Sequence, residues 1–281
     1  MKLIECPRDA MQGLHDFVPT HLKIDYINRL LRVGFDTLDF GSFVSPKAIP
    51  QMRDTAEVLA QLQLDGVSTK LLAIVANIRG AEEAASHEAV HYLGFPFSIS
   101  ETFQQRNTHS SIEQSLLTVD ALLDICSRHN KTAVIYLSMG FGNPYGDVWN
   151  EEIVEMRASQ LVSRGVKILS LADTTGMSTP EKIQRIVPGL LQQFKNTEIG
   201  VHLHSTPYTR LEKIAAAYEA GCRRFDSALM GFGGCPMAAD ELTGNMATED
   251  LIQFLNDKGE NLSLDTDKLR DAQGYARQIF M

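Results

Sequence analysis

Eight short apolar runs recur along the chain, and longer segments with one apolar and one polar face separate most of them. The runs cover residues 2–6, 35–42, 70–76, 89–97, 132–141, 166–173, 199–204 and 223–232. This alternation is typical of a parallel sheet with its crossover helices outside. Eight repeats predict an α/β fold, a closed (β/α)8 TIM barrel. No G-x-G-x-x-G motif follows the first run, which disfavours an open dinucleotide-binding sheet.

The length and composition fit one barrel. The 281 residues are 44% hydrophobic and 22% charged, and no Pro/Ser/Gly-rich linker divides them. Barrels of this type commonly reach this length as one unit. We therefore predict a single catalytic domain over residues 1–281, with a short helical extension from about residue 257.

The charge and the cysteines exclude several classes of protein. A formal net charge of -9 opposes binding to nucleic acid or to an anionic membrane surface. The start MKLIECPRDAMQ contains Arg8 and Asp9 and no long apolar stretch. It predicts neither a signal peptide nor a membrane span, so a cytoplasmic location is the default expectation. The four cysteines form no C-x-x-C pair, which argues against a disulfide scaffold or a structural zinc site.

Polar residues follow several predicted strands at their carboxyl ends, where barrel enzymes carry out their chemistry. They are Arg8, Asp9, Gln12, Asp39, Asp173, His202 and His204. Alternate residues of a strand share a face, so the two histidines of VHLHST present imidazoles to one place. An isolated H-x-H is more often a buried pair without a ligand role. With Asp9, and with Asn245 as a neutral oxygen, the set instead predicts a divalent cation site with open positions.

Two further residues indicate the kind of reaction. Arg8 stands next to the proposed carboxylate ligand, where its guanidinium can stabilise an oxyanion, although an Arg-Asp pair is often only a solvated ion pair. A metal and an arginine suit a reaction that forms an enolate. Cys235 lies in GFGGCP after the last predicted strand. Its glycines predict a loop that could close over a substrate and bring an acid/base group to it.

The segments ECPRDAMQG, DFGSFVSPKAIPQM, LADTTGMSTP, VHLHST, GFGGCPMA and TGNMATEDL resemble, in this order, the 3-hydroxy-3-methylglutaryl-CoA lyase family of metal-dependent barrel lyases. The resemblance spans roughly residues 3 to 256. It implies cleavage of 3-hydroxy-3-methylglutaryl-CoA (HMG-CoA) to acetyl-CoA and acetoacetate with Mg²⁺ or Mn²⁺. This reaction is a step of leucine degradation and ketone-body metabolism. The family is typically dimeric, so the resemblance also implies a homodimer.

The resemblance further implies a role for each residue. The metal ligands would be Asp9, His202, His204 and Asn245. Arg8 would stabilise the enolate of acetyl-CoA, and Cys235 would transfer a proton. Asp173 would orient a ligand or help to move the hydroxyl proton, and Gln12 would line the pocket. Lys47, Arg79 and Ser98 lie in predicted rim loops and are expected to meet the CoA phosphates or the pantetheine arm.

The chain departs from the family pattern near the predicted metal. The acid at the end of the second strand, commonly Glu, is Asp39, and the residue after the second histidine, commonly Asp, is Ser205. Gln12 is followed by Gly13 and Leu14 in place of Asn-Glu. Groups around the ligands orient them and tune the metal. We expect the reaction class to stand and the metal preference, the rate and the choice of acyl chain to be affected.

Three alternatives can be weighed on the sequence. Biotin-dependent carboxyltransferases carry a sequence like KDMAG after the sixth strand. This chain has ADTTG there, so Ala172 stands in place of the lysine, which disfavours this class. A Claisen-condensing synthase usually has a long carboxyl-terminal extension and a different cysteine loop. A CoA-ester or metal-binding protein without turnover would not need an intact site, whereas every proposed group is present here.

Overall fold

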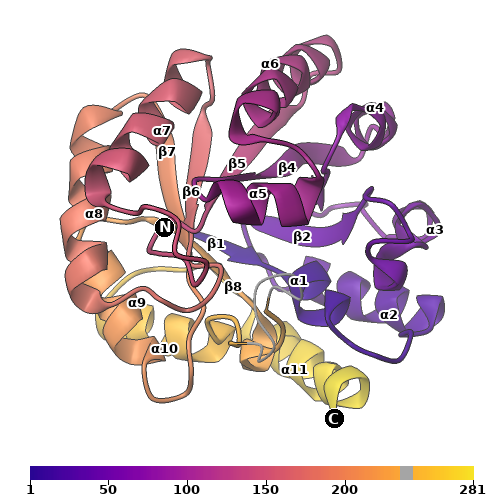
Figure 1. The fold of residues 1–281 in the computed structure, drawn as a ribbon. Coiled ribbons are helices and arrows are strands. Elements are labelled where there is room, and N and C mark those ends of the chain that lie inside the picture. The colour runs from indigo at the N-terminus through magenta and orange to yellow at the C-terminus, as the bar shows by residue number, and fades with distance from the viewer. Residues whose placement is uncertain (235–242) are drawn as a thin grey trace.

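The computed structural model describes residues 1–234 and 243–281, and in them eight parallel strands close into a barrel (Figure 1). Each strand pairs with the next along the chain, and the last pairs with the first. The strands are β1 (Lys2–Glu5), β2 (Thr37–Ser42), β3 (Lys70–Ile74), β4 (Val90–Ser98), β5 (Thr132–Ser138), β6 (Ile168–Ala172), β7 (Glu198–His202) and β8 (Arg224–Ser227). Each predicted run overlaps one strand, and the predicted (β/α)8 barrel is confirmed.

Helices between successive strands surround the barrel (Figure 1). They are α2 (Thr20–Leu31), α3 (Thr55–Ala60), α4 (Ile78–Ser86), α6 (Ile112–Arg128), α7 (Glu151–Ser163), α8 (Pro180–Gln193), α9 (Arg210–Glu219) and, after β8, α10 (Thr248–Asp257). Side chains fix several helix starts. Ser111 and Gln114 form a capping box at α6, and the Asn150 side chain accepts from the third residue of α7.

Short helices stand in the loops at the carboxyl ends of the strands. α1 (Pro7–Gln12) follows β1 and α5 (Glu101–Thr108) follows β4, with the 3₁₀ turns η1 (Pro50–Met52) and η2 (Leu229–Gly231) after β2 and β8. These elements are additional to the eight strand–helix units. They build the rim on which the predicted chemistry depends.

Successive side chains of a strand point alternately into the barrel and out toward the helices, so the apolar residues form two layers. The interior layer consists of Leu72, Tyr92, Val134, Tyr136, Ile168 and Ala172, all from β3 to β6. The intervening residues, such as Leu71, Leu93 and Leu169, belong to the main core between the barrel and its helices. The interior between β7 and β2 is polar instead, because it contains His202, Arg224, Asp226 and Asp39, all buried.

Most strands end earlier than their runs predicted, and at the site β7 ends at His202 and β8 at Ser227. Residues 243–247 return to the rim there and take hydrogen bonds that a longer β7 would have made. The Met246 amide, for example, donates to the Leu203 carbonyl at 3.2 Å. This return follows η2 and the residues beyond it, and it could not be predicted from an apolar run.

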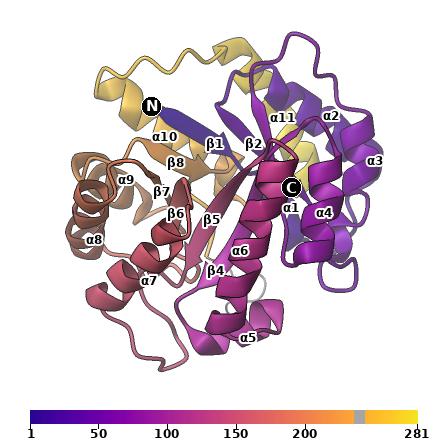
Figure 2. The same ribbon diagram turned by 90° about the horizontal axis from the view of Figure 1, so that it is seen from above.

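The last helix, α11 (Thr266–Phe280), lies beside α2 in both views (Figure 1 and Figure 2). Arg29 of α2 pairs with Asp271 and stacks over the ring of Tyr275, with its Cζ 4.6 Å from the centroid. At the other end of α11, the rings of Phe280 and Phe232 stack with centroids 4.7 Å apart. α11 therefore connects the outside of the barrel to the rim after η2. Among residues 1–234 and 243–281, no helix combines the length and the apolar composition needed to cross a membrane.

Candidate metal centre and active site

Three of the predicted metal ligands meet at the carboxyl end of the barrel. Asp9 stands on α1, directly after β1, His202 ends β7 and His204 follows it, and all three are buried. One ligand atom from each lies within 4.8 Å of the other two. The Nε2 atoms of His202 and His204 are 3.3 Å apart, and His202 Nε2 is 4.0 Å from Asp9 Oδ2.

The fourth predicted ligand, Asn245, reaches the same place on the returning segment. Asn245 forms an isolated antiparallel bridge with His204. Its amide nitrogen donates to Asp9 Oδ2 at 2.7 Å and to the Phe232 carbonyl at 2.9 Å. These bonds occupy the amide nitrogen, so the amide oxygen is the atom that could bind a cation. The structure thus brings together the four residues of the predicted metal site.

The hydrogen bonds of the two histidines fit a cation between them. Nδ1 of His204 lies 3.2 Å from the Thr174 carbonyl, and Nδ1 of His202 lies 3.2 Å from Asp226 Oδ2. Both partners only accept, so in each neutral ring Nδ1 holds the proton and Nε2 has a free lone pair. Two lone pairs facing each other across 3.3 Å are the arrangement that a shared metal ion stabilises.

The charges around the centre favour the metal-binding state of Asp9 and His204. Burial raises the pKa of Asp9, but Arg8 and the two histidines more than offset burial and lower that pKa to about 2, so Asp9 is ionised near neutral pH. Burial and the neighbouring His202 lower the pKa of His204 to about 4, which keeps this ring neutral. Burial also opposes a charge on His202, yet its bond to Asp226 and the charge of Asp9 raise its pKa, so a cation that binds its Nε2 has to compete with a proton. An anionic carboxylate and unprotonated nitrogens are what a divalent cation requires.

Arg8 is fixed by carboxylates on two sides. Its Nε lies 3.0 Å and its Nη2 2.5 Å from Asp39 Oδ2, while its Nη1 lies 2.8 Å from Asp9 Oδ1. Burial is the largest influence on Asp39, and its pKa rises to about 6 despite the arginine. Gln12 donates to Asp9 Oδ1 at 2.7 Å, so it orients that carboxylate as well as facing the cavity. The guanidinium is therefore held in one orientation before any substrate binds.

A cavity of about 280 Å³ opens above these groups. Its floor contains Arg8, Asp9, Gln12, His202 and His204. Its walls include Ser42, Ile49, Asn77, Tyr136, Ser138 and Thr174, and residues 106–109 at the end of α5 complete its outer part. Such a concave space above a cluster of polar groups is the usual form of a small-molecule site.

Several lining residues were missed by the sequence analysis. Ser42, Asn77, Ser138 and Thr174 all end or follow strands, so the rule that located Asp9 could have located them. Arg106 and its neighbours gave no comparable signal, because α5 is an additional helix between β4 and α6. Asp226 was missed too, although a carboxylate inside an apolar run is itself unusual.

Six predicted residues that the structure describes are not part of the lining of the cavity, namely Asp39, Asp173, Lys47, Arg79, Ser98 and Asn245. Asp39 bonds to Arg8 and Asn245 bonds to Asp9, so these two contact residues of the lining. Asp173 accepts from the Ser178 hydroxyl at 2.5 Å and pairs with Lys213 Nζ at 3.1 Å. Lys213 also donates to the His204 carbonyl at 2.8 Å, so Asp173 supports the chain behind a predicted ligand. The Ser98 hydroxyl accepts from the Ser100 amide at the start of α5.

The two basic residues lie at the surface. Lys47 is exposed on the loop after β2, whose neighbours Ser45 and Ala48 line the cavity. Arg79, on α4, borders a separate hollow of about 130 Å³ that shares Ser42 and Val44 with the main cavity. Both are therefore outside the cavity and near its entrance.

Cys235 lies outside the described residues. The chain leading to it passes close to the metal centre, because a Cβ on Gly233 would lie only 2.6 Å from the Asp9 carbonyl and 2.7 Å from Asn245 Nδ2. Gly233 also has φ +96, a conformation that other residues rarely adopt. A side chain at this position is thus excluded twice, by space and by backbone geometry.

The barrel and its site define a class of protein: a (β/α)8 enzyme with a candidate divalent cation site and an arginine beside it at the carboxyl ends of the strands. The chain belongs to the HMGL-like family, whose model matches residues 3–275. It is 34% identical over 278 residues to the cytoplasmic 3-hydroxy-3-methylglutaryl-CoA lyase of Rattus norvegicus, covering 98% of this chain and 80% of the relative. It is 33% identical over 276 residues to the hydroxymethylglutaryl-CoA lyase YngG of Bacillus subtilis (strain 168), and this match covers 97% of this chain and 90% of the relative.

A solved structure shows the same agreement in three dimensions. An HMG-CoA lyase from Acinetobacter baumannii, in complex with coenzyme A and 3-methylmalate, superposes with a TM-score of 0.91 at 32% identity. The match covers 99% of this chain and 90% of that one. The resemblance inferred from motifs is confirmed, and the chain belongs to a family of lyases.

Proposed function

We propose that this chain cleaves HMG-CoA to acetyl-CoA and acetoacetate with a bound Mg²⁺ or Mn²⁺. The observation that carries the proposal is the convergence of Asp9, His202 and His204 beside a fixed Arg8 at the floor of one cavity. The named activity of the relatives supports the substrate. A ligand set of oxygen and imidazole groups supports a hard or borderline cation.

The reaction breaks the bond between C2 and C3 of the acyl chain. The 3-hydroxyl loses its proton, C3 becomes a ketone, and the bonding electron pair remains on the acetyl-CoA fragment as an enolate, which then takes a proton at carbon. When bound, the divalent cation would act as a Lewis acid toward substrate oxygens. Asp9, His202, His204 and Asn245 would hold it.

Arg8 stabilises the charge that develops on the thioester oxygen. Asp39 and Asp9 fix its guanidinium from two sides, so little reorganisation is needed when the enolate forms. We propose that Cys235 protonates the enolate carbon, because a thiol has an ordinary pKa of about 8.5 and suits proton transfer near neutral pH. We propose that Asp39, with its pKa raised to about 6, accepts the hydroxyl proton near neutral pH, while Arg8 stays protonated and in this step only holds this carboxylate. Asp173 acts from behind His204.

The CoA part of the substrate extends out through the cavity mouth. Arg106 is exposed there on α5, where its Cζ lies 4.6 Å from the centroid of the Tyr145 ring, and it has no carboxylate partner among the described residues. We propose that Arg106, Lys47 and Arg79 contact the CoA phosphates. Ser98 acts indirectly, by shaping the start of α5.

We also propose that residues 1–281 act as one domain, with α11 as its extension, in a cytoplasmic homodimer that serves leucine degradation or ketone-body formation. The name of one relative, a cytoplasmic lyase, supports the location. The dimer and the pathway are those that the family resemblance implies. Light scattering of the purified protein tests the dimer, with an expected mass of about twice 31.2 kDa.

One assay tests the proposed reaction. The protein is incubated with HMG-CoA and Mg²⁺, and acetoacetate, acetyl-CoA and free CoA thiol are measured together. A lyase gives acetoacetate and acetyl-CoA in equal amounts and releases no thiol. A thioesterase releases thiol, and a binding protein leaves the thioester intact; either result contradicts the proposal. Running other 3-hydroxyacyl-CoA thioesters in parallel tests the choice of acyl chain.

A further inference from the structure

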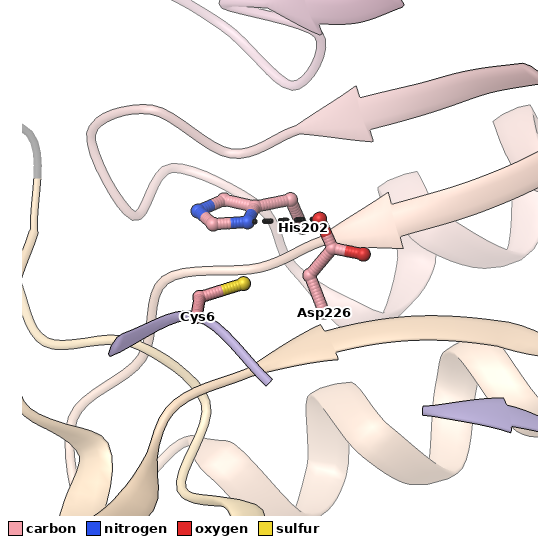
Figure 3. Close-up of side chains that lie close together, drawn as sticks. All are labelled: Cys6, His202 and Asp226. Atoms are coloured by element: carbon pink, nitrogen blue, oxygen red, sulfur yellow. Dashed lines mark hydrogen bonds and ion pairs between the residues drawn. The ribbon is translucent and has the colours of Figure 1, made fainter. Parts of the chain in front are cut away.

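One ring nitrogen of His202 faces the metal centre, and a buried carboxylate holds the other. Figure 3 shows the Asp226 carboxylate beside Nδ1 of His202, with the Cys6 thiol close to both. The Nδ1–Oδ2 distance is 3.2 Å, and the Asp226 side chain is fully buried. The two residues pair across β7 and β8, so the register of the barrel sets their contact.

We propose that Asp226 is the positioning residue of the metal centre: its carboxylate fixes the proton of His202 on Nδ1 and thereby directs the Nε2 lone pair toward the ion. This inference rests on the metal site proposed above. A carboxylate only accepts, so it selects one of the two tautomers of the ring and one orientation. The same contact makes the imidazole a better electron donor to the metal.

The barrel interior places a positive charge on the same face as Asp226. Arg224 lies two residues earlier on β8 and therefore on the same inner face. Its side chain crosses the neighbouring strand at Gly200, where an added Cβ would lie 2.7 Å from Arg224 Cδ. Gly200 thus makes room for a guanidinium inside the barrel.

The hydrogen bonds of Arg224 agree with this role. Its Nη1 lies 3.1 Å from Glu198 Oε1, while its Nε and Nη2 have no hydrogen-bond partner among the described residues. Asp226 Oδ1 is equally without one in that part of the chain. Burial would lower the pKa of Arg224, but the negative charge of Asp226 is the leading influence that raises it. Arg224 therefore neutralises Asp226 across the interior, without taking the oxygen that holds His202.

Cys6 offers a competing explanation of the same cluster. Its sulfur, His202 Nδ1 and an Asp226 oxygen lie within 4.8 Å of one another, and a thiolate, an imidazole and a carboxylate could bind a soft metal. The Cys6 thiol, however, donates a hydrogen bond to the Ile4 carbonyl, with 3.8 Å between the sulfur and the oxygen. A thiol that donates still has its proton and is not a thiolate. Burial is the main cause that raises its pKa. The geometry favours Asp226 acting through His202 over a separate thiolate site.

Three variants test the proposal: Asp226→Ala, Asp226→Asn and, as a control at the neighbouring thiol, Cys6→Ala. Binding of Mn²⁺ to metal-free protein is measured from the electron paramagnetic resonance signal of the free ion. We expect Asp226→Ala to weaken Mn²⁺ binding on the order of 10- to 100-fold, the usual effect of removing a partner of a metal-bound histidine. Asp226→Asn, which keeps an acceptor but no charge, should fall between it and the wild type. Cys6→Ala should leave Mn²⁺ binding within about twofold, since no bond to the ligand is lost.

Further readouts separate positioning from a structural role. In the Asp226 variants, the Mn²⁺ concentration for half-maximal turnover should rise by the same factor as the Mn²⁺ dissociation constant, and KM for the thioester should stay within about threefold of wild type. The melting temperature of the metal-free Asp226→Asn protein should stay near that of wild type. Equal Mn²⁺ affinity in wild type and both Asp226 variants would overturn the proposal. So would a loss in Cys6→Ala as large as in Asp226→Ala, because the cluster itself would then bind the metal. Wild-type protein that binds no Mn²⁺ would overturn the metal site as well.

Discussion

The two halves of the barrel interior use the same strand geometry for different purposes. Between β3 and β6 the inward residues are mostly apolar and form a small core of their own. Between β7 and β2 they are charged or polar and buried, and a series of contacts connects Asp226 through His202 to Asp9, Arg8 and Asp39. An apolar interior stabilises the scaffold, whereas a buried polar one is costly unless its groups are paired, so its presence marks the functional half.

The sharpest test of this division removes a ligand from the polar half. His204→Ala leaves the cation without one of its two imidazoles, so turnover should fall on the order of 10³-fold or more, since metal assistance is worth several kcal/mol. Steady-state assays with increasing Mn²⁺ measure the loss. Treatment of wild type with a chelator should abolish activity, and added Mg²⁺ or Mn²⁺ should restore it. Full turnover in thoroughly metal-stripped protein would place the chemistry elsewhere.

Replacement of Cys235 should give the next largest effect. Cys235→Ala should lose on the order of 10² to 10⁴ in turnover, which is the usual contribution of a positioned acid or base. Metal affinity and melting temperature should remain those of the wild type. In addition, thiol alkylation should reach Cys235 before the three buried cysteines, Cys6, Cys126 and Cys222, and bound substrate should protect it. Near wild-type turnover in Cys235→Ala would assign the proton step to another group.

Arg8→Lys tests whether a charge alone is sufficient. Lysine keeps the charge but cannot make the paired contacts to Asp39 and Asp9, so kcat should fall on the order of 10²-fold with a smaller change in KM. Comparing kcat and KM on the two proteins measures this split. A rise in KM with kcat unchanged would mean that Arg8 only binds substrate.

A substitution in the apolar half should lower the stability of the fold and leave metal binding unchanged. Leu72 is fully buried in the interior layer, so Leu72→Ala should cost about 2 to 5 kcal/mol of unfolding free energy. Denaturant unfolding measures this loss. Mn²⁺ affinity of the folded fraction should not change, because the apolar layer that contains Leu72 includes none of the proposed ligands. A parallel loss of metal affinity would show that the two halves are not independent.

The smallest effect is expected at the cavity mouth. Arg106→Ala should raise KM for the thioester by about three- to tenfold, as an exposed charge contributes of the order of 1 kcal/mol, and leave kcat unchanged. Increasing salt should weaken binding by wild type more than by the variant. Identical salt dependence in both proteins would remove Arg106 from the phosphate contacts.

The sequence predicted the parts of this molecule that depend on local pattern. Eight apolar runs determined the barrel, and position after a strand identified Asp9, Arg8 and both histidines, because parallel strands bring their carboxyl ends together. It could not show that residues 243–247 pair with the end of β7 and place Asn245, since that contact is long-range. It also missed Asp226, whose role depends on strand register.

The same limit explains the predicted residues that are not at the cavity. Asp173 follows β6 as predicted, but Ser178 and Lys213 bind its carboxylate behind His204. Ser98 ends β4, but its hydroxyl serves the start of α5. A rim position brings a residue near the site, whereas its hydrogen-bond partners decide where the side chain points.

The central claim is that the polar half holds one divalent cation on the Nε2 side of His202. Crystals grown with Mn²⁺, with diffraction data collected at an energy where manganese scatters anomalously, test it directly. We predict a single anomalous peak bounded by Asp9, His202, His204 and Asn245, with Asp226 still on Nδ1. A peak between Cys6, Asp226 and Nδ1, or none in protein that turns over HMG-CoA, would contradict it.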